Sequence, residues 1–284
     1  MKDKLYEEYG YKVECLIYRK EYIFFYYENV KYVILKTNLS EQQLINLSQV
    51  VNYLENYSIF FHQLLSNKNG FLFEVGNDHY VLLKPRILVD RLITIDEILK
   101  LSSINIERTP ENVLENKIDF FEQYLDNYNF DVENINYFIG LSENSIALFN
   151  LIGNQNKKHL NHKRIYYNER TFDFYNPLNL VIDYQSRDLA EYAKSMFIAG
   201  NNKIIDYLKY LDYSNWYTYF ARVLYPSYYF DLLDKQISLN EKIDKKRINY
   251  LANSFEKVLR ELYIFINRRV KLPYIDWLSN VDNF

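Results

Sequence analysis

The sequence predicts an α+β fold, in which a small antiparallel sheet near the N-terminus is followed by a larger, mostly helical part. Two observations predict this. Short runs rich in β-branched and aromatic residues crowd the first 85 residues, whereas apolar residues further along recur at the three- and four-residue spacing of helices. With 284 residues, 49% of them hydrophobic, the chain can bury a sizeable core in two lobes.

The N-terminal lobe, residues 1–85, contains five predicted strands and one helix. The helix covers residues 40–57, because Ser40 can cap its first turn and the leucines that follow share one face. Gly76-Asn77-Asp78 is a hairpin turn signal between the last two strands. The predicted strands cover residues 11–18, 22–27, 32–36, 71–75 and 79–83.

The C-terminal lobe, residues 86–284, is predicted to be helical. Its first helix begins with Thr109 as N-cap and Pro110 in the first turn, and the second, over residues 134–152, is apolar enough to be buried. Further helices are predicted over residues 187–199, 202–211, 216–225, 228–237 and 244–269.

Composition excludes several classes of function. The formal net charge is −3 and no sustained basic tract occurs, so we expect no nucleic-acid partner. Cys15 is the only cysteine, so no intramolecular disulfide forms. The charged N-terminus lacks the apolar region of a signal peptide and no apolar run could span a bilayer, so we expect a cytoplasmic protein without a membrane partner.

Several segments resemble a known family. Lys36 ends a predicted third strand, and the other segments are residues 117–148, the HKRI of residues 162–165 and the RVLYPSYYFDLL of residues 222–233. The last of these is the most specific, and the strand lysine is the least. Together they resemble the spore-coat kinase-like proteins of low-GC Gram-positive bacteria, which are similar to aminoglycoside and choline phosphotransferases. The resemblance implies a two-lobed protein-kinase-like fold, in which three strands, one helix and two strands precede a larger helical lobe.

The resemblance also implies a catalytic loop, and this sequence departs from its pattern. In the phosphotransferases a His-Gly-Asp opens the loop, and its aspartate can accept the substrate's proton. Here His162-Lys163-Arg164 stands in its place. A guanidinium cannot accept a proton, so Arg164 cannot replace that aspartate. The asparagine that helps to bind magnesium has no counterpart, since Asn168 is out of register.

Residues that could bind a nucleotide and its magnesium are only partly present. The implied candidates are Lys36 in the third strand and a metal-binding aspartate. Asp173 is the better match for this aspartate by its distance ahead of Asp188-Leu189-Ala190, a supporting motif, and Asp183 is its rival because it follows a strand-like run. ATP and magnesium are expected as cofactors only if nucleotide binding is retained.

The glycine loop and the partner of the lysine are also in question. With six glycines in the whole chain there are few positions for a phosphate-binding glycine loop, and Arg19-Lys20-Glu21 stands where it should be. Glu41 and Glu55, at opposite ends of the helix, are the candidates for the ion pair with Lys36. His159 and His162 have a spacing that suits a metal pair, but no further ligand accompanies them, so no metal site is expected.

These departures favour a catalytically degenerate protein. We expect Arg164 and Arg187 to pair with Asp173, Asp183 or Asp188, so that salt bridges replace a metal. The first hypothesis is a pseudokinase with a binding or scaffolding role, in sporulation or spore-coat assembly, where incorporation into the coat stays open. The alternative is an active ATP-dependent small-molecule kinase with an altered catalytic loop. A third is an interaction protein that binds a protein partner or a small ligand in the former active site.

Overall fold

The computed structural model describes residues 1–19, 22–87, 89–106, 119, 121–123, 135–153, 158–201, 203–239 and 244–279. They fall into two units. The N-terminal unit comprises Met1–Ile93 together with Asn168–Leu180, and the helical unit comprises Thr94–Tyr167 together with Val181–Phe284.

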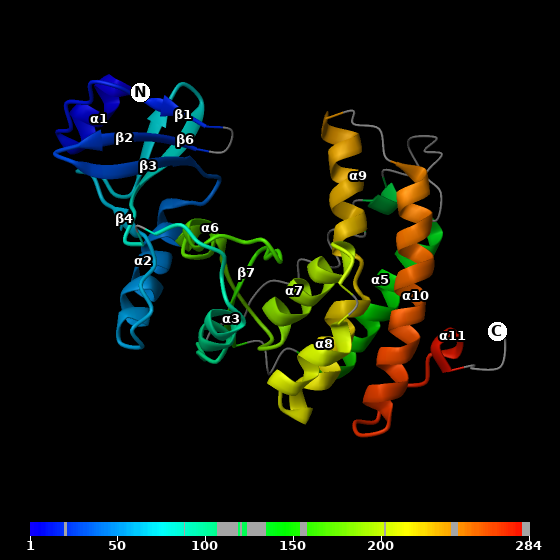
Figure 1. Cartoon of the computed structure of the whole chain (residues 1–284). Helices are drawn as coiled ribbons and strands as arrows, with labels where there is room; N and C mark the ends of the chain where they lie inside the picture. The colour runs from blue at the N-terminus through cyan, green and yellow to red at the C-terminus, as the bar shows by residue number, and fades with distance from the viewer. Residues whose placement is uncertain are drawn as a thin grey trace. The chain divides into compact units, whose positions relative to one another are not determined.

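A six-stranded antiparallel sheet forms the body of the N-terminal unit (Figure 1). The strand order is β1-β2-β3-β6-β4, and β5 pairs with β6 away from this path. The unit also contains helices α1 (Lys2–Tyr9), α2 (Glu41–Glu55) and α6 (Thr171–Phe174) and the 3₁₀ turn η2 (Pro177–Asn179). The strands are β1 (Ile17–Tyr18), β2 (Ile23–Tyr27), β3 (Val30–Lys36), β4 (Gln63–Leu65), β5 (Leu72–Val75) and β6 (Asp78–Lys84).

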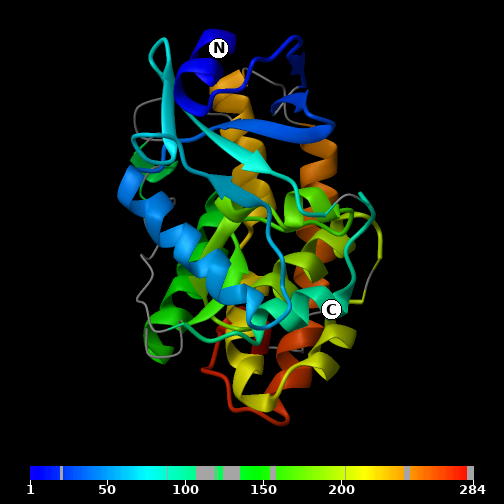
Figure 2. The same ribbon diagram turned by 90° about the vertical axis from the view of Figure 1, so that its left-hand side faces the viewer.

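The two faces of this sheet are covered by different helices. Because side chains alternate along a strand, Tyr32 and Ile34 of β3 point to one face, where they pack with Leu5 of α1. Val33 and Leu35 point to the other face and pack with Leu44 of α2. Figure 1 shows α1 and α2 on opposite sides of the strands, and Figure 2 shows α2 passing beneath them.

Helix α2 begins where the sequence predicts. The Ser40 hydroxyl accepts a hydrogen bond from the Gln43 backbone N–H at 3.3 Å, and the Gln43 side chain accepts one from the Ser40 N–H at 2.8 Å. This capping box satisfies two of the backbone donors that a helix start leaves free. The helix ends at Glu55, two residues before the predicted end.

Four predicted strands are present with small shifts in their ends, but the prediction for residues 11–18 was wrong. Only Ile17–Tyr18 is a strand. Gly10 ends α1 in the left-handed conformation, and the chain beyond it buries Val13 against the sheet without joining it. The strand β4 was missed because its three residues are too few to show an alternating pattern. Helix α1 was not predicted either.

The helical unit contains most of the remaining helices. Those of the C-terminal half lie within two or three residues of their predicted ranges, except that residues 204–210 form a 3₁₀ helix. The predicted helix after Thr109 lies largely outside the described residues. The elements are α3 (Ile95–Ser102), α5 (Ile135–Ile152), β7 (His159–His162), β8 (Leu180–Asp183), α7 (Arg187–Ile198), η3 (Ile204–Tyr210), α8 (Tyr213–Leu224), α9 (Ser227–Leu239), α10 (Lys245–Asn267) and α11 (Asp276–Ser279).

One large core holds this unit together. Helices α5 and α7 pack on α8, and α10 packs on α8 and α11. Aromatic side chains fill much of the core: Phe138 stacks on Tyr229 with ring centroids 3.8 Å apart, and Tyr219, Phe220 and Phe255 are fully buried. Among the described residues no helix is long and apolar enough to cross a membrane.

The N-terminal unit extends beyond the predicted lobe of residues 1–85. It continues to Ile93 and takes in Asn168–Leu180, which follows β7 in the sequence. Backbone contacts join the two pieces: Leu92 and Arg170 form an antiparallel bridge, and the Thr171 N–H donates to the Arg91 carbonyl at 2.8 Å. Neither contact is visible in local sequence patterns.

Candidate functional site

His162 ends strand β7 and is held by an aspartate from the first turn of α7. Both carboxylate oxygens of Asp188 accept from the His162 backbone N–H, at 2.9 and 3.1 Å, and Oδ2 also lies 2.7 Å from Nδ1 of its ring. Both side chains are buried, 2% and 0% exposed. A carboxylate at a helix N-terminus is further stabilised by the helix dipole. Asp188 therefore fixes the start of the loop and the orientation of the His162 ring.

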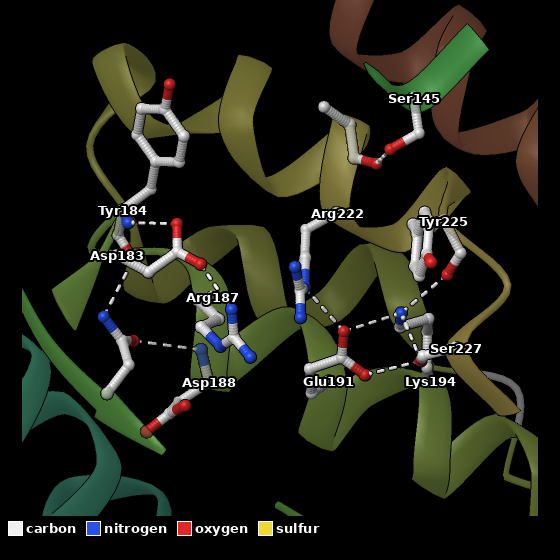
Figure 3. A network of polar contacts seen from close by, with 12 residues as sticks. Ser145, Asp183, Tyr184, Arg187, Asp188, Glu191, Lys194, Arg222, Tyr225 and Ser227 are labelled. Atoms are coloured by element: carbon white, nitrogen blue, oxygen red, sulfur yellow. Dashed lines mark hydrogen bonds and ion pairs between the residues drawn. The ribbon is translucent and has the colours of Figure 1, made fainter. Parts of the chain in front are cut away.

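Asn161 extends this support to the segment between β8 and α7. Its side-chain N–H₂ donates to the Tyr184 carbonyl at 3.1 Å, and its oxygen accepts from the Asp188 N–H at 3.2 Å. Because Asn161 is fully buried, both hydrogen bonds form away from water. The ends of β7 and β8 and the start of α7 are thus held together as one rigid corner (Figure 3).

Asp183, the last residue of β8, forms a partly buried ion pair with Arg187. Its Oδ1 accepts from the Tyr184 N–H at 2.8 Å, and its Oδ2 contacts the Arg187 guanidinium. Burial alone would raise the pKa of Asp183, but the positive charges of Arg187 and Arg222 lower it below its usual value. The carboxylate is therefore ionised, and both of its oxygens already have donors.

Arg187 also holds the loop that follows β7. Its Nε donates to the His162 carbonyl at 3.0 Å, and one terminal nitrogen donates to the Lys163 carbonyl at 3.0 Å. One guanidinium thus satisfies the Asp183 carboxylate and two loop carbonyls. The predicted pairing of Arg187 with Asp183 is confirmed.

Arg164 does not pair with any of the predicted aspartates. It lies 2.9 Å from Asp231 of α9, and its side chain is 54% exposed. The prediction that Arg164 pairs with Asp173, Asp183 or Asp188 was wrong, because α9 brings a different carboxylate to the loop. The guanidinium of Arg164 is therefore paired with a carboxylate of α9.

Asp173 lies in a different unit from Asp183. It belongs to the one-turn helix α6, and its backbone carbonyl accepts from the Asn179 side chain at 3.2 Å. Asp183, in contrast, ends a strand. Both residues stay candidates for the metal-binding aspartate that the resemblance implies, and their settings differ: one ends a strand, and the other lies in a single helical turn.

Lys36 lies on the sheet face opposite α2. It follows Tyr32 and Ile34 in the alternation of β3, and its Nζ lies 2.6 Å from Asp78. In kinases the strand lysine pairs with a glutamate of the helix that α2 corresponds to. Lys36 forms no such pair, and its side chain is 59% exposed.

The two helix glutamates have other partners. The Glu41 carboxylate accepts from the backbone N–H groups of Phe71 and Leu72, at 2.7 and 3.0 Å. Glu55 forms an ion pair with Arg86. Both are therefore used to fasten α2 within its own unit. Lys20 and Glu21, which stand in place of a glycine loop, lie outside the described residues.

The α2 face of the sheet is covered by the chain's own segment Asn168–Leu180. Leu178 is buried among Val33, Leu35 and other residues of that face. Phe172 packs on Tyr22 with ring centroids 5.5 Å apart, and the Lys31 Nζ lies 5.4 Å from the Phe172 ring centroid. Sequence reasoning missed this covering, because it depends on contacts between distant parts of the chain.

His62 fastens that segment to the sheet. It is fully buried, and its Nδ1 accepts from the Arg86 N–H at 3.2 Å. The other ring nitrogen therefore carries the proton and donates to the Phe172 carbonyl at 3.0 Å. Burial, together with the charge of Lys31, lowers the pKa of His62 to about 4. His62 is thus a neutral bridge.

A second buried ion network lies further along α7 (Figure 3). Glu191 accepts from Lys194 at 2.8 Å and from Arg222 of α8 at 2.6 Å. Lys194 also donates to the Tyr225 carbonyl and the Ser227 hydroxyl, so its three protons all have acceptors. Burial lowers the pKa of Lys194 to about 8 despite Glu191.

This network was missed by sequence analysis, although a signal existed. Arg187, Glu191 and Lys194 recur at spacings of four and three, which places all three on one face of a helix. That face packs against α8. A charged stripe on a buried helix face requires internal partners, and Arg222 is one of them.

The described residues contain no cluster of three or more histidine, cysteine, aspartate or glutamate side chains that could hold a metal ion by themselves. An incoming ion at Asp183 would have to displace a guanidinium. In this corner the carboxylates of Asp183 and Asp188 are held in an ion pair and in hydrogen bonds.

Comparison with solved structures identifies the fold. An aminoglycoside phosphotransferase from Alicyclobacillus acidocaldarius is similar over 90% of this chain and 93% of its own, with a TM-score of 0.60 and 9% identity. Spectinomycin phosphotransferase APH(9)-Ia, crystallised with ADP and spectinomycin, gives a TM-score of 0.54 at 13% identity over 94% and 97% of the two chains. A thermostable mutant of APH(4)-Ia gives 0.55 at 11% identity over 92% and 99%. The predicted kinase-like fold is therefore confirmed.

Sequence comparison identifies the family. No curated protein matches the chain. The family model described as "Spore coat putative kinase YutH" matches residues 116–263, a little over half of the chain and a range that contains His162, Asp183 and Asp188. The chain belongs to this family of kinase-like spore-coat proteins.

Proposed function

We propose that this protein is a pseudokinase, a phosphotransferase relative that no longer transfers phosphate and instead acts by binding or scaffolding. The observation that carries the proposal is the ion pair between Asp183 and Arg187. In an active enzyme the corresponding carboxylate must be open to magnesium. Here the guanidinium supplies the positive charge from within the protein.

Two further observations support the proposal. Arg164 stands in place of the proton-accepting carboxylate and pairs with Asp231. Lys36 points away from α2 and pairs with Asp78, so it does not form the ion pair with a helix glutamate. We interpret these three features as the loss of the base, of the open metal-binding carboxylate and of the lysine–glutamate pair, all of which phosphoryl transfer uses.

The family suggests where such a protein would act. Its description names the spore coat, and we propose a role in sporulation or in coat assembly, with synthesis in the cytoplasm before incorporation. A kinase-like fold that does not transfer phosphate can still bind a partner. The ion pairs of Asp183 and Glu191 would keep the helical unit rigid, so that it presents a fixed surface.

A nucleotide test separates this proposal from an active kinase with an altered loop. We expect no shift of the melting temperature with millimolar ATP and magnesium, and no ATP consumption above buffer with a panel of hydroxyl compounds. Phosphorylation of any of these compounds that is lost in Asp183→Asn or Asp173→Asn would refute the proposal. Positioning alone can support some transfer, so a slow but mutation-sensitive rate also counts against it.

A further inference from the structure

A cleft separate from the kinase-like corner lies at the C-terminal end of the helical unit. It is bounded by the last turn of α10, the return segment after it and α11, which lie together near the C-terminus in Figure 1. Its volume is about 470 Å³, within the range of small-molecule sites. Apolar walls come from Tyr263, Ile264, Leu272 and Tyr274.

The walls of the cleft are fixed by hydrogen bonds. The Tyr263 hydroxyl donates to the Pro273 carbonyl at 2.9 Å, and the Leu272 N–H donates to the Asn267 side chain at 2.9 Å. Ser279 donates to the Ile275 carbonyl at 2.7 Å. The buried side chains of Leu272 and Ile275 anchor the same segment in the core. Binding of a ligand would therefore not require this backbone segment to become ordered, which avoids an entropic cost.

Two cations line the cleft without a counter-charge. Arg268 and Lys271 are exposed, and no ion pair joins either of them to another described residue. The lining contains no acidic side chain. The neighbouring Arg269 differs, because its guanidinium lies 4.5 Å from the Phe265 ring centroid and is engaged there. The cleft thus combines apolar walls with positive charge that no acidic side chain among its described lining residues neutralises.

We infer that this cleft binds a small anionic molecule with an aromatic or aliphatic body, of the aromatic carboxylate or sulfonate class. Arg268 and Lys271 would pair with the anionic group, since a guanidinium and an ammonium both donate to carboxylate or sulfonate oxygens. Tyr263 and Tyr274 would contact the apolar body. The inference does not depend on the proposed pseudokinase role, since none of these residues belongs to the Asp183 corner.

The test uses 8-anilinonaphthalene-1-sulfonate with the full chain, followed by fluorescence. We expect saturable binding of one molecule per chain, and at least tenfold weaker binding in the double variant Arg268→Ala, Lys271→Ala. The matched control is Lys257→Ala, an exposed lysine of the same helix outside the cleft, which should bind as the parent does. Equal urea midpoints for the three proteins would establish that folding is unaffected.

Competition then tests the chemistry of the ligand. Benzoate should displace the probe, whereas benzyl alcohol, which lacks the charge, and inorganic phosphate, which lacks the apolar body, should each need at least tenfold higher concentration. Absence of saturable binding, unchanged binding in the double variant, or equal displacement by benzyl alcohol would each overturn the inference.

Discussion

Arg187 illustrates how one side chain can hold together a strand, a helix start and a loop. Its guanidinium neutralises Asp183 and binds two carbonyls of the loop after β7. The sequence allowed this pairing to be predicted, because the two residues are four apart at a strand-to-helix junction. It could not predict Asp231 as the partner of Arg164, since that contact depends on the packing of α9.

Replacing Arg187 with methionine should destabilise the protein by about 3–5 kcal/mol, because it leaves the Asp183 carboxylate buried without its closest partner. Urea unfolding measures the change. The matched control is Arg170→Met, which breaks an exposed pair with Asp90 and should cost less than about 1 kcal/mol. Similar losses in the two variants would mean that the Asp183 pair is not the internal substitute for a metal that we propose.

The buried side chain of His62 predicts that the stability of the protein depends on pH. Its pKa is about 4 in the folded protein against 6.5 when exposed, so the unfolded chain binds a proton that the folded one excludes. The free energy of unfolding is therefore unaffected by this proton above pH 6.5 and falls as the pH drops from 6.5 toward 4. The total loss from His62 amounts to roughly 3 kcal/mol.

The measurement compares urea unfolding between pH 7.5 and 4.5 for the parent and for His62→Asn. The parent should lose more stability over this range, because carboxylates titrate alike in both proteins and only the parent carries the buried histidine. His79→Asn, which changes an exposed histidine of β6, should follow the parent. Parallel curves for parent and His62→Asn would show that His62 is not kept neutral.

At the scale of elements, local sequence determines where α2 begins, whereas contacts between distant residues determine how it is fastened to the sheet. The Ser40 capping box was readable from the sequence, as were the strands with alternating residues. The sequence did not show to which face of the sheet Lys36 points. Alternation along β3 sorts side chains into two faces, but only the packing of α1 and α2 shows which helix covers each face. The supporting bond of Glu41 to the loop before β5 was likewise invisible.

Gly70 offers a test of how α2 is fastened. Its φ is +142°, and a Cβ there would lie 2.3 Å from a carboxylate oxygen of Glu41. Gly70→Ala should therefore displace that carboxylate from the Phe71 and Leu72 N–H groups and add backbone strain, for a loss of about 2–4 kcal/mol in urea unfolding.

Gly10 is the matched control, because it also has a positive φ, +76°, but has nothing within 4 Å of an added Cβ. Gly10→Ala should cost only the conformational penalty of about 1 kcal/mol. If both substitutions cost the same, Glu41 is not constrained by Gly70 and the anchoring of α2 must come from its apolar face alone.

At the scale of the whole molecule, the N-terminal unit is built from two separate pieces of chain. The composition and order of elements predicted a strand-rich first part and a helical second part, and the structure has both. The sequence did not reveal that Asn168–Leu180 belongs with the sheet, because Phe172 packs on Tyr22 and Leu178 packs with Val33, residues far earlier in the chain. Such pairing has no local signature.

This discontinuity predicts the behaviour of fragments. A fragment of residues 1–93 lacks Leu178 on the α2 face, the bond from His62 to the Phe172 carbonyl and the bridge between Leu92 and Arg170. It should therefore show no cooperative urea transition by far-ultraviolet circular dichroism. Adding a synthetic peptide of residues 166–182 should restore one, because the peptide returns the buried contacts that the sheet has lost.

The control peptide carries Phe172→Ser and Leu178→Ser, which remove the apolar contacts and keep the backbone groups. It should fail to restore the transition at the same concentration. A fragment of residues 1–93 that unfolds cooperatively without any peptide would contradict the prediction. In that case the segment would be an addition to a lobe that is already complete without it.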